Sequence, residues 1–255
     1  MQNGGLRIKG IEKKNQQEKP LITVVTVVYN GAESLEQTIT SVINQTYDNI
    51  EYIIIDGGSK DGTLDIIKKY EDKIDYWQSE PDKGIYDAMN KGIELASGDW
   101  INFMNAGDCF VNAEVLSSVF RNNNNFDFDV LYGDACDENG ESLISYKKIN
   151  TYFFLRLKMI NHQSMFIKRK ILLEHNYDLN YKIIADREQF IWAYKEGKRI
   201  SYLNQKIAQF DTNGISSNFG KMKTELEKCL KKYFNPFVRI IFYLNLLLLK
   251  IKKIY

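Results

Sequence analysis

Histidine and cysteine are scarce in this sequence of 255 residues. The three cysteines, Cys109, Cys136 and Cys229, are odd in number and show no C-x-x-C spacing, which disfavours both a disulfide framework and a zinc site. The two histidines, His162 and His175, form no H-E-x-x-H motif or other paired spacing. Hydrolysis by a bound transition metal is therefore disfavoured, and a reducing compartment fits the cysteine usage best.

An excess of charge of one sign is also missing. Thirty-four basic residues oppose thirty-three acidic ones, which leaves a net charge of +1. The molecule as a whole therefore has no field that would recruit nucleic acid, and no arginine-rich stretch marks an RNA or DNA groove. Nucleic acid is not an expected partner, and any ligand must be held by local groups.

The C-terminal region, residues 218–255, has a hydrophobic run too short to span a membrane. The uncharged stretch from Ile240 to Leu249 falls well short of the roughly 20 residues that a spanning helix needs. Basic residues bracket it, which predicts amphipathic helices lying on an anionic membrane surface. A helix packed in the core or in a dimer is the alternative. The basic residues are Lys228, Lys231, Lys232, Arg239, Lys250, Lys252 and Lys253.

The N-terminus shows no charged segment followed by an apolar one, as a signal peptide would. Residues 1–19 consist largely of Gly, Lys, Gln, Glu and Asn. This composition predicts a flexible tail. We therefore expect no export, and a cytoplasmic protein attached peripherally to the cytoplasmic face of the membrane.

Apolar, β-branched runs are what the sequence does contain. "LITVVTVVYN" (21–30) and "IEYIIID" (50–56) read as buried parallel strands, and residues 32–47 between them show helical spacing of apolar residues. A strand over 74–80, a helix over 85–96 and a strand that begins near Trp100 and leads to Asp108 follow. Because parallel strands end at one edge of a sheet, we expect Asn30, Asp56 and Asp108 to share a cleft.

The second half of the chain changes character. Residues 128–148 predict two strands around an Asn-Gly turn, an antiparallel hairpin at a sheet edge. "HQSMFIKR" (162–169) reads as another strand and residues 184–197 as a helix. The sequence thus predicts one α/β domain over 20–217, with a mostly parallel, Rossmann-like sheet flanked by helices and a C-terminal helical extension.

Strand-end polar groups beside a glycine-rich loop, "GGSKDGT" (57–63), suggest a site for a nucleotide diphosphate with a divalent ion. Hard carboxylate oxygens suit Mg²⁺ or Mn²⁺, and these ions also bridge phosphate oxygens. Taken singly, Asp56 and Asp108 could equally be turn or strand-end residues, since Asp and Gly are common in turns. Only the three positions together predict a site.

Ordered motifs in the chain strongly resemble the inverting family 2 glycosyltransferases of the GT-A fold. They run from "VVTVVYNGAESLEQTITSVINQTYDNIEYIIIDGGSKDGT" through "SEPDKGIYDAMNKGIELASGDWINFMNAGDCF" and "HQSMFIKR" to "YKIIADREQFIW" and "FDTNGISS". The resemblance implies a GT-A fold and transfer of a hexosyl or N-acetylhexosaminyl group from a nucleotide sugar. The sequence is most similar to bacterial members of the family that extend a lipid-linked acceptor in capsule, O-antigen or exopolysaccharide synthesis. A UDP-sugar is the first expectation for the donor.

The resemblance also assigns donor-binding positions. The segment around Tyr29 and Asn30 should border the nucleotide, and Asp56 should hydrogen-bond the base. "NAGD" lies where the family has its D-x-D-like metal motif, but Gly107 stands where many relatives carry Asp, so only Asp108 remains to reach Mn²⁺ or Mg²⁺ directly. The remaining donor-binding positions are Asp82, Lys83, Gly84, Asp87, Asn105, Gly107 and His162.

For the chemistry, the resemblance places the catalytic base at Asp186 in "IADREQF". Inversion needs a carboxylate that takes the proton of the attacking acceptor hydroxyl. Glu188 is the reserve candidate, and an N-terminal charge that favours the helix dipole is the alternative for Asp186. His162 and Gln163 resemble a motif near the donor pyrophosphate or the acceptor; a histidine of the core is the alternative for His162.

Rival functions are less compatible with the sequence. A nucleotidyltransferase would need a glycine-rich, basic phosphate loop after the first strand, and "VVYNGAESLEQ" has neither its glycines nor a Lys or Arg. A Rossmann oxidoreductase would need G-x-G-x-x-G there. The alternative that stays open is a non-catalytic partner of a membrane polysaccharide assembly that binds a nucleotide sugar without transferring it, as Gly107 would allow.

Overall fold

In a computed structural model of the chain, the structure describes residues 1–16, 19–121, 127–144, 149–150, 154, 160–210 and 219–252. The strands are β1 (Gln2–Gly4), β2 (Ile22–Val28), β3 (Ile50–Asp56), β4 (Tyr76–Ser79), β5 (Trp100–Phe103), β6 (Cys109–Phe110), β7 (Val130–Cys136), β8 (Ser142–Ile144), β9 (Met165–Lys168) and β10 (Ile200–Gln209). The α-helices are α1 (Leu35–Ile43), α2 (Thr63–Lys69), α3 (Ile85–Leu95), α4 (Val115–Phe120), α5 (Arg169–Glu174), α6 (Ala185–Lys195), α7 (Phe219–Tyr233) and α8 (Pro236–Lys252). The 3-10 turns include η1 (Leu6–Lys9) and η4 (His162–Ser164).

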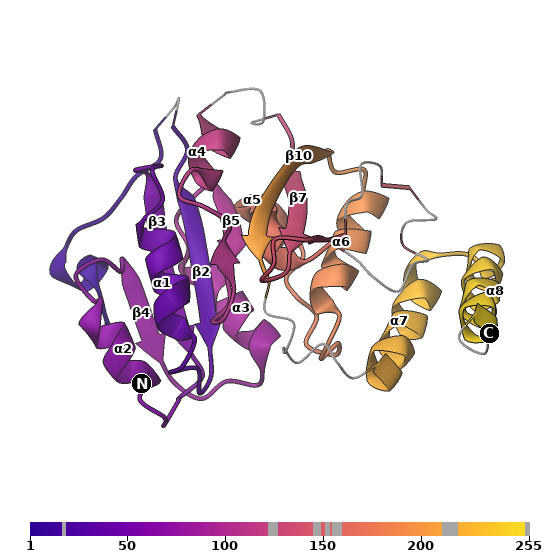
Figure 1. The fold of residues 1–255 in the computed structure, drawn as a ribbon, viewed down its shortest axis with the longest axis horizontal. Coiled ribbons are helices and arrows are strands. Elements are labelled where there is room, and N and C mark those ends of the chain that lie inside the picture. The colour runs from indigo at the N-terminus through magenta and orange to yellow at the C-terminus, as the bar shows by residue number, and fades with distance from the viewer. Residues whose placement is uncertain are drawn as a thin grey trace.

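Across the described residues the strands form one ten-stranded sheet in the order β1-β4-β3-β2-β5-β9-β7-β10-β6, with β8 paired to β7 (Figure 1). β4, β3, β2 and β5 are parallel neighbours, as the alternation of strands and helices predicts. β9 then runs antiparallel between β5 and β7. The carboxyl ends of β2, β3 and β5 therefore meet at one edge, where the cleft was expected.

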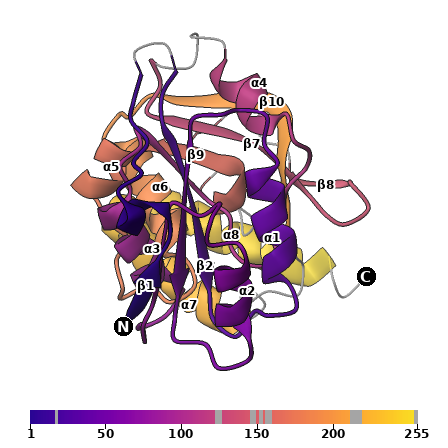
Figure 2. The ribbon, with the colours of Figure 1, turned by 90° about the vertical axis from the view of Figure 1, so that its left-hand side faces the viewer.

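Both faces of the sheet are covered by helices, which explains why β2 and β3 are apolar without interruption. In β2, Val25 and Val27 pack with α3 on one face, whereas Ile22, Val24 and Val28 pack with α1 on the other. The core on the α3 face also includes residues of α5, α6 and α7. The core on the α1 face includes residues of α2 and α4. Figure 2 shows α1 and α2 on the side of the sheet opposite α3.

The predicted hairpin over 128–148 exists, with β7 and β8 paired in antiparallel orientation. Its position differs from the expectation, because β7 lies inside the sheet between β9 and β10 rather than at an edge. Strand β10, which lies far along the chain, pairs with β7 in parallel orientation, so β7 is not an edge strand. The last residues of the predicted hairpin, 145–148, lie outside the described residues.

The N-terminal segment is docked on the domain, so the flexible tail expected from its composition is wrong for residues 1–16. Strand β1 pairs with the edge strand β4. Arg7 forms an ion pair with buried Glu51, and Lys13 forms one with buried Asp75 at 2.8 Å. These two carboxylates belong to the sheet region, so the polar N-terminal segment neutralises charges that would otherwise be buried alone.

The C-terminal helices lie at the end of the molecule away from the N-terminus (Figure 1). Helix α7 contributes Leu226, Cys229 and Leu230 to the core shared with α3 and α6, so it is packed against the α/β domain. Helix α8 follows and packs through Phe242, which is buried. Among the helices that the structure describes, none combines the length and the apolar character needed to cross a membrane.

Candidate functional site

Asp56 ends β3 and organises the loop that follows it. Its carboxylate is fully buried and accepts hydrogen bonds from the backbone N–H of Gly58 (3.2 Å) and Ser59 (3.1 Å), and from the hydroxyls of Ser59 and Ser79. Gly58 has a φ of +83°, which favours glycine there. Neither serine could be identified from the sequence, because their hydroxyls reach Asp56 only once the loop has folded. Contact between Asp56 and a base stays a prediction.

Asn30 ties the end of β2 to the same loop. It has a φ of +49°, a left-handed conformation that Asn adopts more readily than most residues. Its backbone N–H donates to Ser59 Oγ at 2.7 Å, and its side-chain Oδ1 accepts from the N–H of Lys60 at 3.0 Å. The predicted donor positions Asn30 and Asp56 are therefore brought together, with Ser59 between them.

Tyr29 and Asp82 lie on either side of Gly57. A Cβ built on Gly57 would come within 2.6 Å of Asp82 Oδ2 and 3.2 Å of Tyr29 Cδ2. The Tyr29 side chain is 67% exposed, so its ring is available to a ligand above the strand ends. The two segments that the resemblance assigns to the nucleotide thus meet at Gly57, and a side chain there would require Asp82 or Tyr29 to shift.

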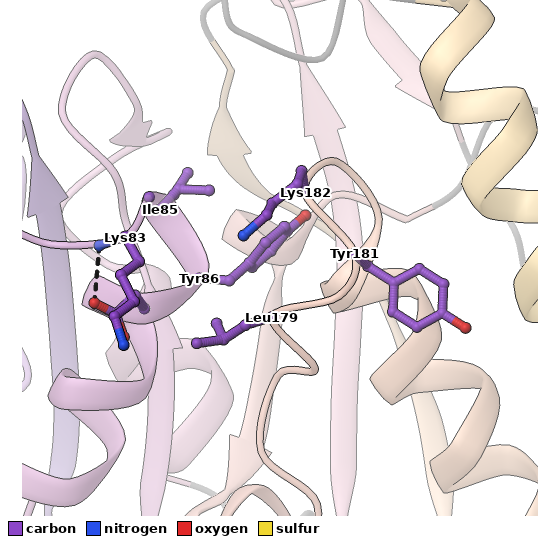
Figure 3. A pocket seen from close by; sticks show the side chains of 8 residues that line it. Lys83, Ile85, Tyr86, Leu179, Tyr181 and Lys182 are labelled. Carbon is purple, nitrogen blue, oxygen red and sulfur yellow. Dashed lines mark hydrogen bonds between the residues drawn. The ribbon is translucent and has the colours of Figure 1, made fainter.

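The segment from Asp82 to Asp87 turns the chain into α3. Asp82 Oδ1 accepts from the N–H of Gly84 at 2.8 Å, and Asp87 Oδ2 accepts from the N–H of Lys83 at 2.9 Å. Figure 3 shows Lys83, Ile85 and Tyr86 facing Leu179 and Lys182 across a hollow beside α3. The full lining of this hollow is Lys83, Gly84, Ile85, Tyr86, Asp87, Leu179, Tyr181 and Lys182.

Asp108 follows β5 at the same edge and is almost fully buried, with 4% of its surface exposed. Gln163 Nε2 donates to its Oδ2 at 2.6 Å. Thr38 on α1 fixes the backbone, since its hydroxyl donates to the Asp108 carbonyl at 2.8 Å and accepts from the N–H of Gly107 at 3.0 Å. Gly107 has a φ of +100°, a backbone conformation that favours glycine at this turn.

The residues at this edge fit a hard divalent cation, although with fewer carboxylates than a complete protein site. Among the described residues no cluster of three or more His, Cys, Asp or Glu side chains could hold a metal. Besides Asp108, the loop offers Asn105 Oδ1, a buried amide oxygen without a hydrogen-bond partner in the described structure. Carboxylate and amide oxygens are ligands that Mg²⁺ and Mn²⁺ accept, and a donor diphosphate would supply the remaining ones.

Asp186 lies in the first turn of α6, and its side chain is 22% exposed. Its Oδ1 accepts from the Tyr86 hydroxyl and from the N–H of Arg187, both at 2.8 Å. Its Oδ2 accepts from His162 Nδ1 at 3.0 Å. Burial alone would raise the pKa of Asp186, but the hydrogen bonds from His162 and Tyr86 hold that pKa below its usual value. The carboxylate is therefore ionised at neutral pH.

Tyr86 is a site residue that the sequence analysis missed. Its hydroxyl proton is shared between Asp186 Oδ1 and the carbonyl of Ile183, each at 2.8 Å. Burial first, and then the Asp186 charge, raise the pKa of Tyr86 well above its usual value, so the phenol stays a donor. The sequence placed Tyr86 only within a predicted helix, and its partner lies 100 residues further along the chain.

His162 lies between Asp186 and the loop after β5. Its Nε2 faces Asn105 Nδ2 at 2.7 Å. Since an ionised carboxylate can only accept, we assign the ring proton to Nδ1, and Nε2 then accepts from the Asn105 amide. Hydrogen bonds therefore run from Asn105 through His162 to Asp186.

Glu188, the reserve candidate for the base, faces away from Asp186. Its carboxylate is fully buried and accepts from His175 Nε2 (3.0 Å), Lys232 Nζ (2.6 Å) and the Tyr233 hydroxyl. It joins α6 to α7 and leaves Asp186 as the candidate base. The last motif of the resemblance, "FDTNGISS", lies almost wholly in residues 211–218, outside the described residues.

Comparisons with known proteins show what this chain is similar to. A family model described as Glycosyl transferase family 2 matches residues 23–181. An uncharacterised glycosyltransferase of Mycobacterium tuberculosis is 32% identical over 209 residues, which cover 78% of this chain and 78% of that protein. A PGL/p-HBAD biosynthesis glycosyltransferase of Mycobacterium bovis is 27% identical over 208 residues, covering 78% of this chain and 80% of the relative.

Solved structures share the fold. Staphylococcus aureus TarS 1-349 in complex with UDP superimposes with a TM-score of 0.67 at 18% identity, covering 82% of this chain and 64% of that one. Mannosyltransferase PcManGT from Pyrobaculum calidifontis, in complex with GDP-Man and Mn²⁺, superimposes with a TM-score of 0.65 at 14% identity, covering 85% and 64%. The chain thus spans less than two thirds of these structures. At such identities the likeness shows the fold, and it confirms the predicted α/β architecture.

Proposed function

The chain belongs to glycosyl transferase family 2, and on that premise we propose that it transfers a sugar from a nucleotide diphosphate to a hydroxyl of a glycan acceptor, with inversion at the anomeric carbon. The nucleotides bound by the structural neighbours, UDP, UDP-GlcNAc and GDP-Man, support a nucleotide sugar as the donor. A lipid-linked acceptor in polysaccharide synthesis is the proposed second substrate.

The observation that carries this proposal is the ionised carboxylate of Asp186 beside the strand-end site. Oδ1 already accepts two hydrogen bonds, whereas Oδ2 accepts only from His162 among the described residues. Oδ2 therefore has a lone pair for the acceptor hydroxyl. In the proposed reaction Asp186 takes the proton of that hydroxyl as its oxygen bonds to the anomeric carbon, and the bond from that carbon to the nucleoside diphosphate breaks on the opposite face.

On the donor side, the nucleotide would be bordered by Tyr29, Asn30, Asp82 and the loop held by Asp56. Asp108 and Asn105 would hold a divalent cation, which when bound offsets the negative charge on the departing diphosphate. The protein's further part is to hold the donor and the acceptor hydroxyl in line, because positioning alone can provide a large share of the acceleration.

The alternative is a partner that binds a nucleotide sugar without transferring it, and Gly107 is the observation that favours it. Calorimetric titration with UDP, GDP and dTDP, with and without Mn²⁺, would identify the nucleotide. Release of UDP from UDP-GlcNAc or GDP from GDP-Man would then be compared between wild type and Asp186→Asn. Turnover that depends on Asp186 supports the enzyme; nucleotide binding without any turnover, in the presence of lipid-linked glycan, supports the partner.

We also propose that α8 attaches the protein to an anionic membrane. Phe237, Ile240 and Leu244 are 70%, 56% and 54% exposed, and their spacing places them on one side of the helix. Phe242, on the other side, is 1% exposed and packs inward. Exposed Lys231 on α7 adds positive charge, and apolar side chains beside basic ones are typical of helices that lie in a membrane interface.

Flotation with vesicles of phosphatidylglycerol or phosphatidylcholine tests this proposal. We expect binding to the anionic vesicles, and its loss when Phe237, Ile240 and Leu244 are all changed to Gln. Leu173→Gln is a matched control, since Leu173 on α5 is 46% exposed. Unchanged flotation of the triple variant would refute membrane attachment, and a concentration-dependent dimer lost in that variant would support the dimer alternative.

A further inference from the structure

One short turn contacts both carboxylates of the candidate site. His162 and Gln163 are consecutive residues of η4, yet His162 Nδ1 donates to Asp186 Oδ2 (3.0 Å) and Gln163 Nε2 donates to Asp108 Oδ2 (2.6 Å). Asp108 and Asp186 are far apart in the sequence, since one follows β5 and the other lies at the start of α6. The turn is therefore the direct structural connection between the two carboxylates.

The turn itself is held by buried hydrogen bonds. Asn102 in β5 is fully buried, and its Nδ2 donates to the carbonyls of Gln163 (2.9 Å) and Met165 (2.8 Å). Ser164 is also fully buried, and its hydroxyl donates to the Asn161 carbonyl at 2.9 Å. Because these groups are shielded from water, rotating or shifting η4 would leave several of them without partners, which is costly.

The two side chains of the turn suit their partners. Gln163 is a neutral donor, so it can fix the orientation of Asp108 without cancelling the negative charge that a cation needs. His162 uses both ring nitrogens: Nδ1 donates to Asp186, and Nε2 accepts from Asn105 at 2.7 Å. Both ring nitrogens are thus engaged by protein groups, so the contact with the donor that the resemblance implies would have to replace one of these hydrogen bonds.

We propose that η4 is a positioning element, in which His162, oriented by Asn105, aims the Asp186 carboxylate at the acceptor and Gln163 aims the Asp108 carboxylate at the donor side. This inference rests on the proposed function of the site. Neither His162 nor Gln163 touches a reacting atom; each acts through the carboxylate that it holds. Gln163 thereby compensates for Gly107, because the sole carboxylate of the loop is kept in one orientation by a buried partner.

The first test reads the state of His162 directly. The chain has two histidines, so nitrogen-15 spectra of the imidazole rings give one set of signals for each. His162 is expected to carry its proton on Nδ1, whereas His175, whose Nε2 lies 3.0 Å from Glu188 Oε2, is expected to carry one on Nε2. Asp186→Asn should change the His162 signals alone. A His162 ring without a proton on Nδ1, or one whose proton is averaged between the two nitrogens, would overturn the proposal.

The second test separates the two ring nitrogens of His162 by substitution. The amide nitrogen of Asn can replace Nδ1, so His162→Asn keeps a donor for Asp186; Gln instead reaches the place of Nε2 and loses that donor. We expect His162→Gln to lower kcat by about 100-fold, as misplacement of a reacting group can, with donor affinity unchanged by calorimetry. His162→Asn should be about tenfold more active than His162→Gln, a difference that a purely structural role would not produce.

A pH profile of turnover adds a readout specific to Asp186. The ionisable groups that face this carboxylate are His162, Tyr86 and Tyr177. Without the His162 hydrogen bond the pKa of Asp186 should rise, so the acid limb of the profile should move to higher pH in His162→Gln. An unchanged acid limb together with wild-type kcat would refute positioning by His162.

For Gln163, the matched variant is Gln163→Leu, which removes the donor at similar volume. We expect the Mn²⁺-dependent part of nucleotide binding to weaken by about 10- to 100-fold in calorimetry, as when other partners of metal ligands are removed. Unchanged Mn²⁺ dependence would refute this half of the inference.

Failure of the inference can be told from failure of the proposed function. If Asp186→Asn is inactive while His162→Gln turns over like wild type, the base assignment stands and the positioning role is wrong. If Asp186→Asn itself keeps full turnover, the assignment of the base falls, and the positioning role of His162 falls with it.

Discussion

Replacing Glu188 with Gln should destabilise the protein by about 3 kcal/mol at neutral pH. Glu188 is fully buried between α6 and α7. Although burial raises its pKa, hydrogen bonds from His175, Lys232 and Tyr233 outweigh burial and lower the pKa from 4.5 to about 2. At about 1.4 kcal/mol per pH unit, this difference between the unfolded and the folded protein corresponds to about 3 kcal/mol of stability.

The pH dependence of this contribution follows from the direction of the change. Because the folded protein lowers the pKa of a carboxyl group, the stabilisation is fully present above about pH 4.5 and is lost as the pH falls towards about 2. Urea unfolding curves of wild type and Glu188→Gln, recorded from pH 2 to pH 7, should therefore differ most at neutral pH and converge in acid.

A matched control is Glu174→Gln, which removes another carboxylate that pairs with a lysine. The Glu174 carboxylate lies 2.7 Å from Lys198 Nζ but is 49% exposed, so its loss should cost well under about 1 kcal/mol. Two results would contradict a stabilising role of this buried network between α6 and α7. One is a loss of stability in Glu188→Gln no larger than in this control. The other is a difference in free energy of unfolding between wild type and Glu188→Gln that stays the same at every pH.

Three further substitutions test the site. Asp186→Asn should lower turnover by about 10²- to 10⁴-fold, the usual worth of a general base, and leave nucleotide binding by calorimetry unchanged; retained turnover would remove Asp186 from its role. Asp108→Ala should abolish the Mn²⁺ dependence of nucleotide binding, and equal binding with and without Mn²⁺ in wild type would contradict the assigned ligand. Gly107→Ala should cost about 1–3 kcal/mol in urea unfolding, because a φ of +100° strains a residue with a Cβ. An Ala variant as stable as wild type would show that the turn can relax.

The parts of the fold that the sequence predicted well are those fixed by local patterns. The apolar run 50–56 is β3 residue for residue, and the helical spacing over 85–96 is α3 with its last residue omitted. The shared edge of Asn30, Asp56 and Asp108 followed from the general rule that parallel strands end together. These predictions needed no knowledge of distant pairing.

The predictions that failed depended on contacts between distant segments. The interior place of β7 requires β10, which pairs with it across some 70 residues of chain. The docked N-terminal segment depends on Arg7 and Lys13 finding Glu51 and Asp75, two carboxylates that a strand pattern does not mark as buried. Polarity alone suggested a free tail, whereas the ion pairs explain why polar residues belong there.

In the site, motifs in the sequence indicated the candidate residues, and the structure identified their hydrogen-bond partners. The resemblance singled out Asp108 and Asp186, whose roles stay predictions, and the structure brings the positions around Tyr29 and Asp82 together at Gly57. The hydrogen bonds of Tyr86, Gln163 and Ser79 could not be predicted, because each depends on where a partner outside its own motif comes to lie.

The two ends of the sheet bear on how the protein behaves at high concentration. The outermost strands of the described sheet, β1 and β6, contain three and two residues. Long, open edge strands can template the addition of strands from other molecules, and very short ones offer little for another chain to pair with. Residues 2–4 therefore protect the edge of β4, and an expression variant that begins after them would expose it to self-association.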